Sequence, residues 1–208
     1  MQPSSCSYIK SSGILTREAS DMDLKKLEEA ARLIIEAIGE DSQREGLLET
    51  PKRFADMMAE QMAYAAVSND DIAEEFNKTF ESPESNMVVV KDISLFSHCE
   101  HHIALMYHMH AAVGYIPKGR VIGLSKIARL ADAVSRRLQI QERIGTDIRD
   151  IMTKITGTED VIVFLEGEHS CMTARGIKKP GALTRTVAAG GRFKDDTALR
   201  NEFLALIK

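Results

Sequence analysis

Apolar side chains after residue 20 recur at helical spacing in two N-terminal segments. Between residues 24 and 38 they recur every three or four positions, which predicts an amphipathic helix that Gly39 ends. Thr50 followed by Pro51 is typical of a helix start, because proline fits the first helical position. We therefore predict a second helix that continues through Met62 and fills its core face with methionines.

The centre of the chain changes from helical to strand-like patterns and back. Residues 87–96 and 107–116 are rich in β-formers, and a Pro-Lys-Gly turn signal follows the second run. The polar cluster at 98–102 is therefore predicted to lie between two strands. Ser125 is predicted to cap a third helix, and a fourth helix is expected at 141–155 before Gly157.

The C-terminal third predicts a second pair of strands, at 161–165 and 184–188, and a closing helix at 197–207. Because the strands come as two hairpin-like pairs, the predicted fold class is α+β with a mainly antiparallel sheet. The patterns divide the chain into a disordered polar tail (1–20), a helical region (21–80) and a sheet-bearing region (81–208).

Composition and charge narrow the function classes. The 208 residues are 44% hydrophobic, enough for a full core. The net charge of -4 and the pI near 5.9 argue against a general nucleic-acid-binding protein, which usually has a basic surface. No apolar run reaches about 18 residues and no secretory signal is visible, so we expect a cytoplasmic protein without a membrane partner.

Two polar clusters carry candidate metal chemistry. The segment 99–102 (Cys-Glu-His-His) places a thiol and an imidazole three residues apart, so that one turn can present both to a cation. Cys171, in the cluster 168–171, is the other cysteine beyond the polar tail that holds Cys6. Two thiolates and one imidazole favour zinc, and three protein ligands leave a fourth position open to water, as in catalytic sites.

The spacing alone leaves alternatives open. His101 or His169 could close a structural zinc site as a fourth ligand, or the two cysteines could bind no metal. A zinc deaminase does not fit, because its signature includes two cysteines in a P-C-x-x-C motif. The titratable neighbours Glu100, His101, Glu168 and His169 suit general acid–base chemistry.

A local excess of basic residues opposes the acidic net charge. Residues 120–143 hold six Lys or Arg side chains against Asp132 and Glu142. Ser125 and Lys126 lie at a predicted helix start, where backbone N–H groups favour a phosphate, and Arg129 follows one turn later. A solvated helix face is the alternative. Together with a hydrolytic metal site, the pattern favours a phosphorylated small molecule as substrate, although no P-loop motif is present.

Motifs along most of the chain resemble those of the GTP cyclohydrolase I family. They are the Cys-Glu-His-His segment, GYIPKGRVIGLSKIAR, SRRLQIQERI, the His-Ser-Cys-Met block with its following Arg-Gly, the closing RNEFLALI and the upstream GLLETPKRFADMM. The resemblance covers roughly residues 22–208. It implies the tunnelling fold for a catalytic domain at 81–208, with subunit sheets joined side by side into barrels, and a homodecamer of two stacked pentamers.

The resemblance also implies a role for each matching residue. Cys99, His102 and Cys171 match the zinc ligands, and His101 with His169 matches the proton-transfer pair. The resemblance implies that other matching residues contact the substrate GTP, and that Gln141 and Glu142 hold the guanine. It implies that the ribose or triphosphate is contacted by Ser125, Lys126, Arg129 and Arg175. Arg53 matches a residue that reaches the triphosphate from a neighbouring subunit.

The implied reaction is hydrolytic. Water attacks C8 of GTP, the imidazole ring opens, formate leaves and the ribose rearranges. Ring closure then gives 7,8-dihydroneopterin triphosphate, from which folate and other pterins are made. Two alternatives are a divergent enzyme that stops at a ring-opened or cyclic-phosphate product, and a non-catalytic, zinc-stabilised oligomer that binds guanine nucleotides.

Three features depart from the family pattern. His98 stands where a small or apolar residue is usual, so it could compete for the metal or add a third titrating histidine. The stretch 103–113 lacks the usual glycine turn and is about one residue longer than in the family pattern. The geometry of this hairpin is therefore not predicted. Ala182 replaces a common serine.

Overall fold

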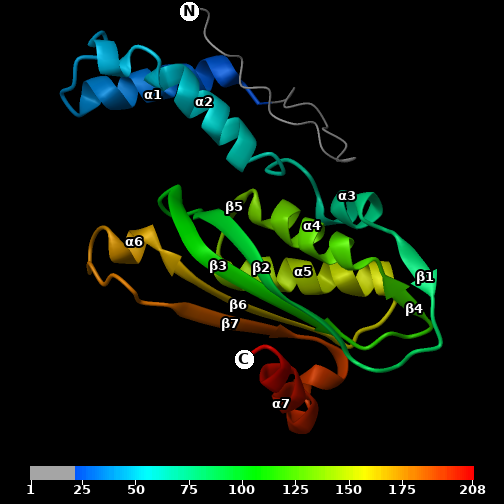
Figure 1. Cartoon of the computed structure of the whole chain (residues 1–208). Helices are drawn as coiled ribbons and strands as arrows, with labels where there is room; N and C mark the ends of the chain where they lie inside the picture. Colours follow the sequence, from blue (N-terminus) through cyan, green and yellow to red (C-terminus); the bar gives the residue numbers. More distant parts are fainter. Residues whose placement is uncertain (1–21) are drawn as a thin grey trace, which may run out of the picture. The chain divides into compact units, whose positions relative to one another are not determined.

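The computed structural model describes residues 22–208, so the predicted tail and Cys6 lie outside it. The chain divides into two compact units, one that ends at Ala59 and one that spans Glu60–Lys208 (Figure 1). In the described range no helix is long and apolar enough to cross a membrane.

The first unit is helical. It contains α1 (Leu24–Ala37), η2 (Glu45–Leu47) and most of α2 (Thr50–Gln61). Asp23 caps α1, because its carboxylate accepts a hydrogen bond from the backbone N–H of Lys26. Both predicted N-terminal helices are therefore present, and α2 ends one residue before Met62.

The second unit is built on strands. Within residues 60–208 they form a five-stranded sheet in the order β5-β2-β3-β6-β7 and a two-stranded sheet of β1 and β4. Neighbours in the larger sheet pair antiparallel, except that β5 runs parallel to β2. The strands are β1 (Thr79–Glu81), β2 (Val88–Cys99), β3 (Ala104–Tyr115), β4 (Arg120–Ile122), β5 (Leu138–Gln139), β6 (Val161–His169) and β7 (Thr184–Ala189).

Helices cover both faces of the larger sheet. The main core joins one face to α3 (Asn69–Glu75), α4 (Leu124–Ser135) and α5 (Gln141–Thr156). On the other face Ala112 and Ile162 pack against Phe193 of η3 (Gly191–Lys194) and Phe203 of α7 (Thr197–Leu206). Burial of an isoleucine or phenylalanine side chain stabilises the fold by roughly 1.5–3 kcal/mol. One helical turn, α6 (Ser170–Thr173), follows β6.

The structure corrects two local predictions and adds one helix that was not predicted. Gly123, not Ser125, is the N-cap of α4, and the helix begins at Leu124 without a side-chain cap. β2 continues through Cys99, so the thiol lies on a strand rather than in the connection. The helix α3 was not predicted. Its apolar side chains, with Phe76 just beyond it, join the main core, so α3 belongs to the compact unit that begins at Glu60.

The long hairpin of β2 and β3 contains irregular pairs. The register shifts between Val90 and Ile93, and β3 shifts against β6 between Tyr107 and His110. His108, inside the second shift, has φ +47°, a left-handed conformation that occurs in one type of β-bulge. Ile103 has φ +50° in the β2–β3 turn. The stretch 103–113 thus begins in a turn that lacks glycine and contains a bulge.

Candidate metal centre and active site

Cys99 occupies the last position of β2, where two neighbouring strands fix its backbone. It pairs with Ala104 of β3 and with Gln139 of β5. The side chain is 4% exposed and belongs to the main core. The chain then turns, and the backbone N–H of His102 donates to the Cys99 carbonyl at 3.4 Å. This turn brings the His102 ring back toward the thiol.

Cys171 reaches the same place from β6 and α6. The Ser170 hydroxyl donates to the Leu105 carbonyl of β3 at 2.7 Å, and Tyr107 shares a hydrogen bond of 2.9 Å with Thr173. These two contacts fix α6 against the start of β3. They place Cys171 opposite the turn that carries His102.

Cys99, His102 and Cys171 form one group. Their ligand atoms all lie within 4.8 Å of one another, and the Cys99 Sγ is 3.6 Å from the His102 Nδ1. The Arg175 Nη1 lies 2.7 Å from the His102 Nε2, and Nδ1 is the ring nitrogen on the side of the Cys99 thiol. Burial raises the pKa of the Cys171 thiol, and the Cys99 sulfur raises it further. A bound cation would oppose both effects, and the donor set suits a borderline-soft metal.

Other titratable side chains of the described chain do not join this group. His98 is buried, and burial lowers its pKa; its Nδ1 has no hydrogen-bond partner. Because it precedes Cys99 on a strand, its side chain points to the opposite face. His101 is exposed on the turn. The group therefore has three members from two segments, and neither His101 nor His169 closes it as a fourth ligand.

His169 lies at the end of β6, beside the start of α5. Its Nε2 is 2.9 Å from the Gln141 Oε1, and it is partly buried. Burial lowers the pKa of His169, and the carboxylate of Glu142 opposes that effect. Glu142 itself is exposed in the first turn of α5. The site thus pairs a half-buried imidazole with a solvent-accessible carboxylate.

A bidentate ion pair joins the turn to the same helix. Arg143 donates from Nη1 and Nη2 to the two carboxylate oxygens of Glu100, at 2.8 and 3.0 Å. This hydrogen bonding lowers the pKa of Glu100. In the sequence, Arg143 stands out only as part of the basic excess, because nothing local indicates that it pairs with a residue 43 positions away.

Glu168 holds the segment that follows α6. Its carboxylate accepts from the His108 Nδ1 at 3.0 Å and from the Gly181 backbone N–H at 3.2 Å, and the His108 contact is the main cause of its lowered pKa. These bonds connect the β3 bulge to the loop that carries Arg175. Sequence reasoning gave Glu168 no such partner.

The basic start of α4 lies away from the Cys–His–Cys group of the same chain. The helix runs from Gly123, whose N–H donates to the Lys78 carbonyl, toward β5, which pairs with Cys99 (Figure 1). Its 12 residues correspond to about 18 Å of length. Ser125 and Lys126 lie in the first turn, at the distant end, and Arg129 lies near the middle of the helix. Arg53 is exposed on α2 in the other compact unit.

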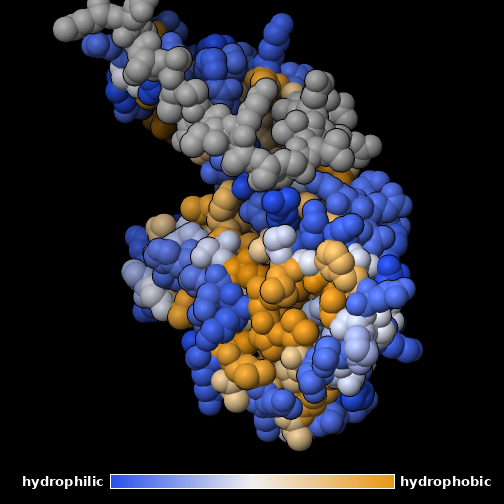
Figure 2. Space-filling model, turned by 45° about the vertical axis from the view of Figure 1, so that its right-hand side comes forward, coloured by the Kyte–Doolittle hydropathy of each residue, from blue (hydrophilic) through white to orange (hydrophobic). Residues whose placement is uncertain are grey.

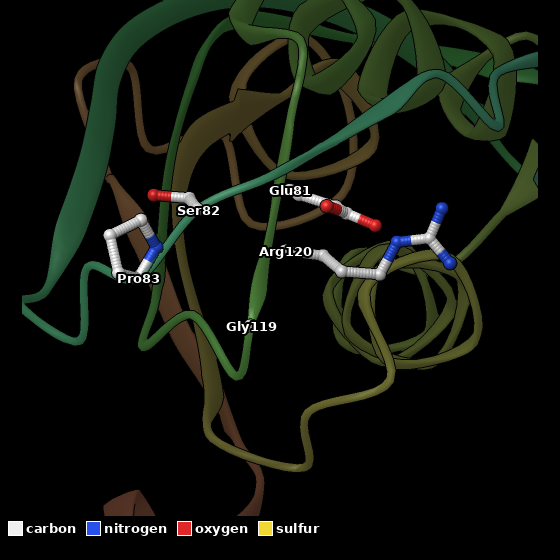
Figure 3. Close-up of a pocket in the computed structure, with 5 residues that line it drawn as sticks. All are labelled: Glu81, Ser82, Pro83, Gly119 and Arg120. Atoms are coloured by element: carbon white, nitrogen blue, oxygen red, sulfur yellow. The ribbon is translucent and has the colours of Figure 1, made fainter.

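A separate, open pocket of about 540 Å³ lies at one end of the β1–β4 pair (Figure 3). Glu81 and Arg120 line it with Ser82, Pro83 and Gly119, and none of these belongs to the Cys–His–Cys group. This pocket is therefore separate from the candidate metal centre.

The fold and the site together define a class: an α+β protein in which two cysteines and a histidine can hold a metal ion. The profile of the family described as GTP cyclohydrolase I matches residues 27–208. The chain therefore belongs to the GTP cyclohydrolase I family. The predicted family and its α+β tunnelling fold are both confirmed.

Several curated relatives match nearly end to end. A protein of Clostridium acetobutylicum named GTP cyclohydrolase 1 is 59% identical over 192 residues, which cover 90% of this chain and 98% of that one. Proteins with the same name from Clostridium botulinum and Clostridium beijerinckii are 56% and 54% identical. They too cover at least 89% of this chain and 97% of their own.

Proposed function

We propose that this chain is a zinc-dependent GTP cyclohydrolase I, which converts GTP and water to 7,8-dihydroneopterin triphosphate and formate in the cytoplasm. One observation carries the proposal. Three metal-ligand side chains converge within 4.8 Å in a chain that is 59% identical to a protein named for this activity. Such a metal group suits hydrolysis of a purine ring better than simple nucleotide binding.

Cys99, His102 and Cys171 would hold the zinc. Two thiolates and one neutral imidazole are a common zinc donor set, and three protein ligands are typical of a catalytic site. When bound, zinc supplies Lewis-acid activation of water at neutral pH. Burial raises the pKa of the half-buried Cys171 thiol, and a bound cation would oppose that effect.

His169 and His101 would move the protons. His169 is partly buried at the end of β6, beside the exposed Glu142 carboxylate. His101 is exposed on the same turn as His102, next to Glu100, which Arg143 holds. Ring opening and closure both require a group that takes and returns a proton, which neutral imidazoles do near pH 7.

Glu142 would select guanine. A carboxylate accepts from the ring N–H and the amino group of guanine, whereas adenine would leave that charge unpaired. Gln141, the other residue that matches a guanine contact, is 1% exposed, and its side-chain amide already bonds within the chain. We therefore assign recognition of the base to the side chain of Glu142.

The phosphate contacts would come from more than one subunit. Arg175 lies beside His102, but Ser125 and Lys126 lie at the far end of α4, with Arg129 near the middle of the helix. A substrate that reaches the metal group of one copy would meet the α4 start, and the Arg53 side chain, of other copies. We propose that the chain forms a homo-oligomer whose active sites are shared between subunits. The proposed assembly is a decamer of two pentamers.

Incubation of the purified protein with GTP tests the proposal. We expect formate in equal amount to consumed GTP, and a product that becomes fluorescent as oxidised neopterin. Consumption of GTP without that fluorescence would favour an enzyme that stops at an earlier product. Binding of GTP without formate, at full zinc content, would contradict the proposed activity and favour a nucleotide-binding oligomer.

A further inference from the structure

The side chain of Gln141 is fixed inside the chain at the start of α5. It is 1% exposed, although it opens a helix at the edge of the proposed site. Its Nε2 donates to the backbone carbonyls of Thr184 at 3.0 Å and Leu165 at 3.3 Å. Carbonyl oxygens only accept, so the amide nitrogen must face them, and the orientation of the amide follows from its partners.

The Gln141 oxygen therefore faces His169. The Oε1 lies 2.9 Å from the His169 Nε2. A carbonyl-type oxygen has no proton to give, so the hydrogen bond requires a proton on Nε2. In a neutral imidazole the other nitrogen, Nδ1, then has no proton and is the acceptor.

We propose that Gln141 is a positioning residue that holds His169 in the Nε2–H tautomer and makes Nδ1 the nitrogen that exchanges protons with substrate. The exchange with substrate rests on the proposed function, whereas the tautomer does not. The same bonds leave Gln141 no free amide N–H for a purine. Gln141 thus positions His169, whereas the adjacent Glu142 is proposed to bind guanine.

Nitrogen-15 NMR of the full-length, zinc-loaded protein reads the tautomer directly. With labelled histidine, the His169 signals are assigned by their loss in His169→Asn. We expect the protonated nitrogen of neutral His169 to couple to both ring C–H protons, as Nε2 does, and its N–H to exchange slowly. A proton on Nδ1 would overturn the proposal in the unmodified protein, whatever the variants do.

A pair of variants distinguishes the loss of the contact with His169 from the general effect of removing a buried amide side chain. Gln141→Met removes the acceptor, and Gln139→Met is the matched control because Gln139 is equally buried but bonds to Val134 and Asp147. We expect Gln141→Met to lose the slowly exchanging His169 N–H and about 10-fold in kcat with little change in KM. Gln139→Met should keep that N–H signal.

The outcomes distinguish this inference from the proposed function. An unchanged His169 N–H signal in Gln141→Met would refute the positioning role, even if GTP is turned over normally. If Gln141→Met does not fold, the tautomer of the unmodified protein decides. Absence of formate from GTP would refute the activity but leave the tautomer assignment standing.

Discussion

Cys99 and Cys171 come from segments that are far apart in sequence, and each is fixed by a different strand. Cys99 ends β2, whereas Cys171 follows β6 on a single helical turn. Removal of either thiol would leave two of the three proposed metal ligands. At the scale of single residues, the site therefore depends on each of its three members.

We predict that Cys171→Ala loses bound zinc and activity together, because two ligands hold zinc far more weakly than three. Metal content by mass spectrometry and formate release from GTP measure the two losses. Met172→Ala is the control, since Met172 is the adjacent exposed residue outside the group. Normal turnover with one zinc per chain in Cys171→Ala would refute the ligand assignment.

A histidine outside the metal group should behave differently. We predict that His169→Asn lowers kcat by about 10² to 10⁴ while zinc content and GTP affinity remain nearly unchanged, because it removes only acid–base assistance. The control is His110→Asn, an exposed histidine farther along β3. If His169→Asn instead strips the metal, a four-ligand structural site is the better description.

Some contacts of single residues could be predicted from the sequence and others could not. The spacing of Cys99 and His102 is local, so their convergence could be expected before any fold was known. The contact of Gln141 with His169 joins residues 28 positions apart. It forms because the start of α5 meets the end of β6. Neither residue type signals that contact, since a glutamine at a helix start is ordinary.

At the scale of elements, the prediction was best where a single residue determines the boundary. Gly157 ends α5 in a left-handed conformation with φ +71°, as expected for a helix C-terminus. The short helix α3 was missed although Ser68 and Asp71 form a capping box. Its seven residues are too few for helical periodicity to stand out. The cap of α4 was misplaced because Gly123 offers no side-chain signal.

The short helix η3 depends on one carboxylate. Asp160 accepts from the backbone N–H and the Nε of Arg192, each at 2.7 Å. Burial alone would raise the pKa of Asp160, but these hydrogen bonds outweigh it and lower the pKa. Because the folded pKa is below the unfolded value of about 3.9, the stabilisation is complete above that pH. It is lost as the pH falls through the folded pKa.

We predict that Asp160→Asn lowers the free energy of unfolding by about 1 kcal/mol at pH 7. The difference from the unmodified protein should shrink below about pH 4. Denaturant unfolding at pH 7 and at about pH 3.5 measures it. Asp150→Asn is the control, since Asp150 pairs only with its neighbour Arg149 at the surface. An equal loss at both pH values would contradict the role of the charge.

At the scale of the whole molecule, the sheet and the surface favour association. In the described part of the chain β5 and β7 are the outer strands of the larger sheet. Figure 2 shows a broad apolar patch on one face of the second unit. Exposed large apolar side chains of that unit include Phe80, Leu124, Leu183 and Val187. A patch of this kind is typical of a protein–protein contact.

Shared sites make a specific prediction for mixed assemblies. We expect Lys126→Ala and His169→Asn to be nearly inactive alone, and to regain activity when co-expressed or dissociated and reassembled together. If each site takes its metal group and its α4 start from different copies, random mixing restores about a quarter of the sites. Assembly is checked by light scattering. No regain in well-mixed oligomers, or a fully active monomer, would refute shared sites.

The closeness of the two thiols also affects how the protein must be handled. Their sulfur atoms lie within 4.8 Å of each other; Cys99 is buried at the end of β2, and Cys171 is half-buried on the one-turn helix α6. Once the cation is lost, oxidation in air can join the two sulfurs in a covalent bond and remove two ligands at once. Storage without a reductant would then convert a reversible loss of metal into a lasting one. Free-thiol titre and the capacity to rebind zinc would decline together, and a dithiol reductant would restore both.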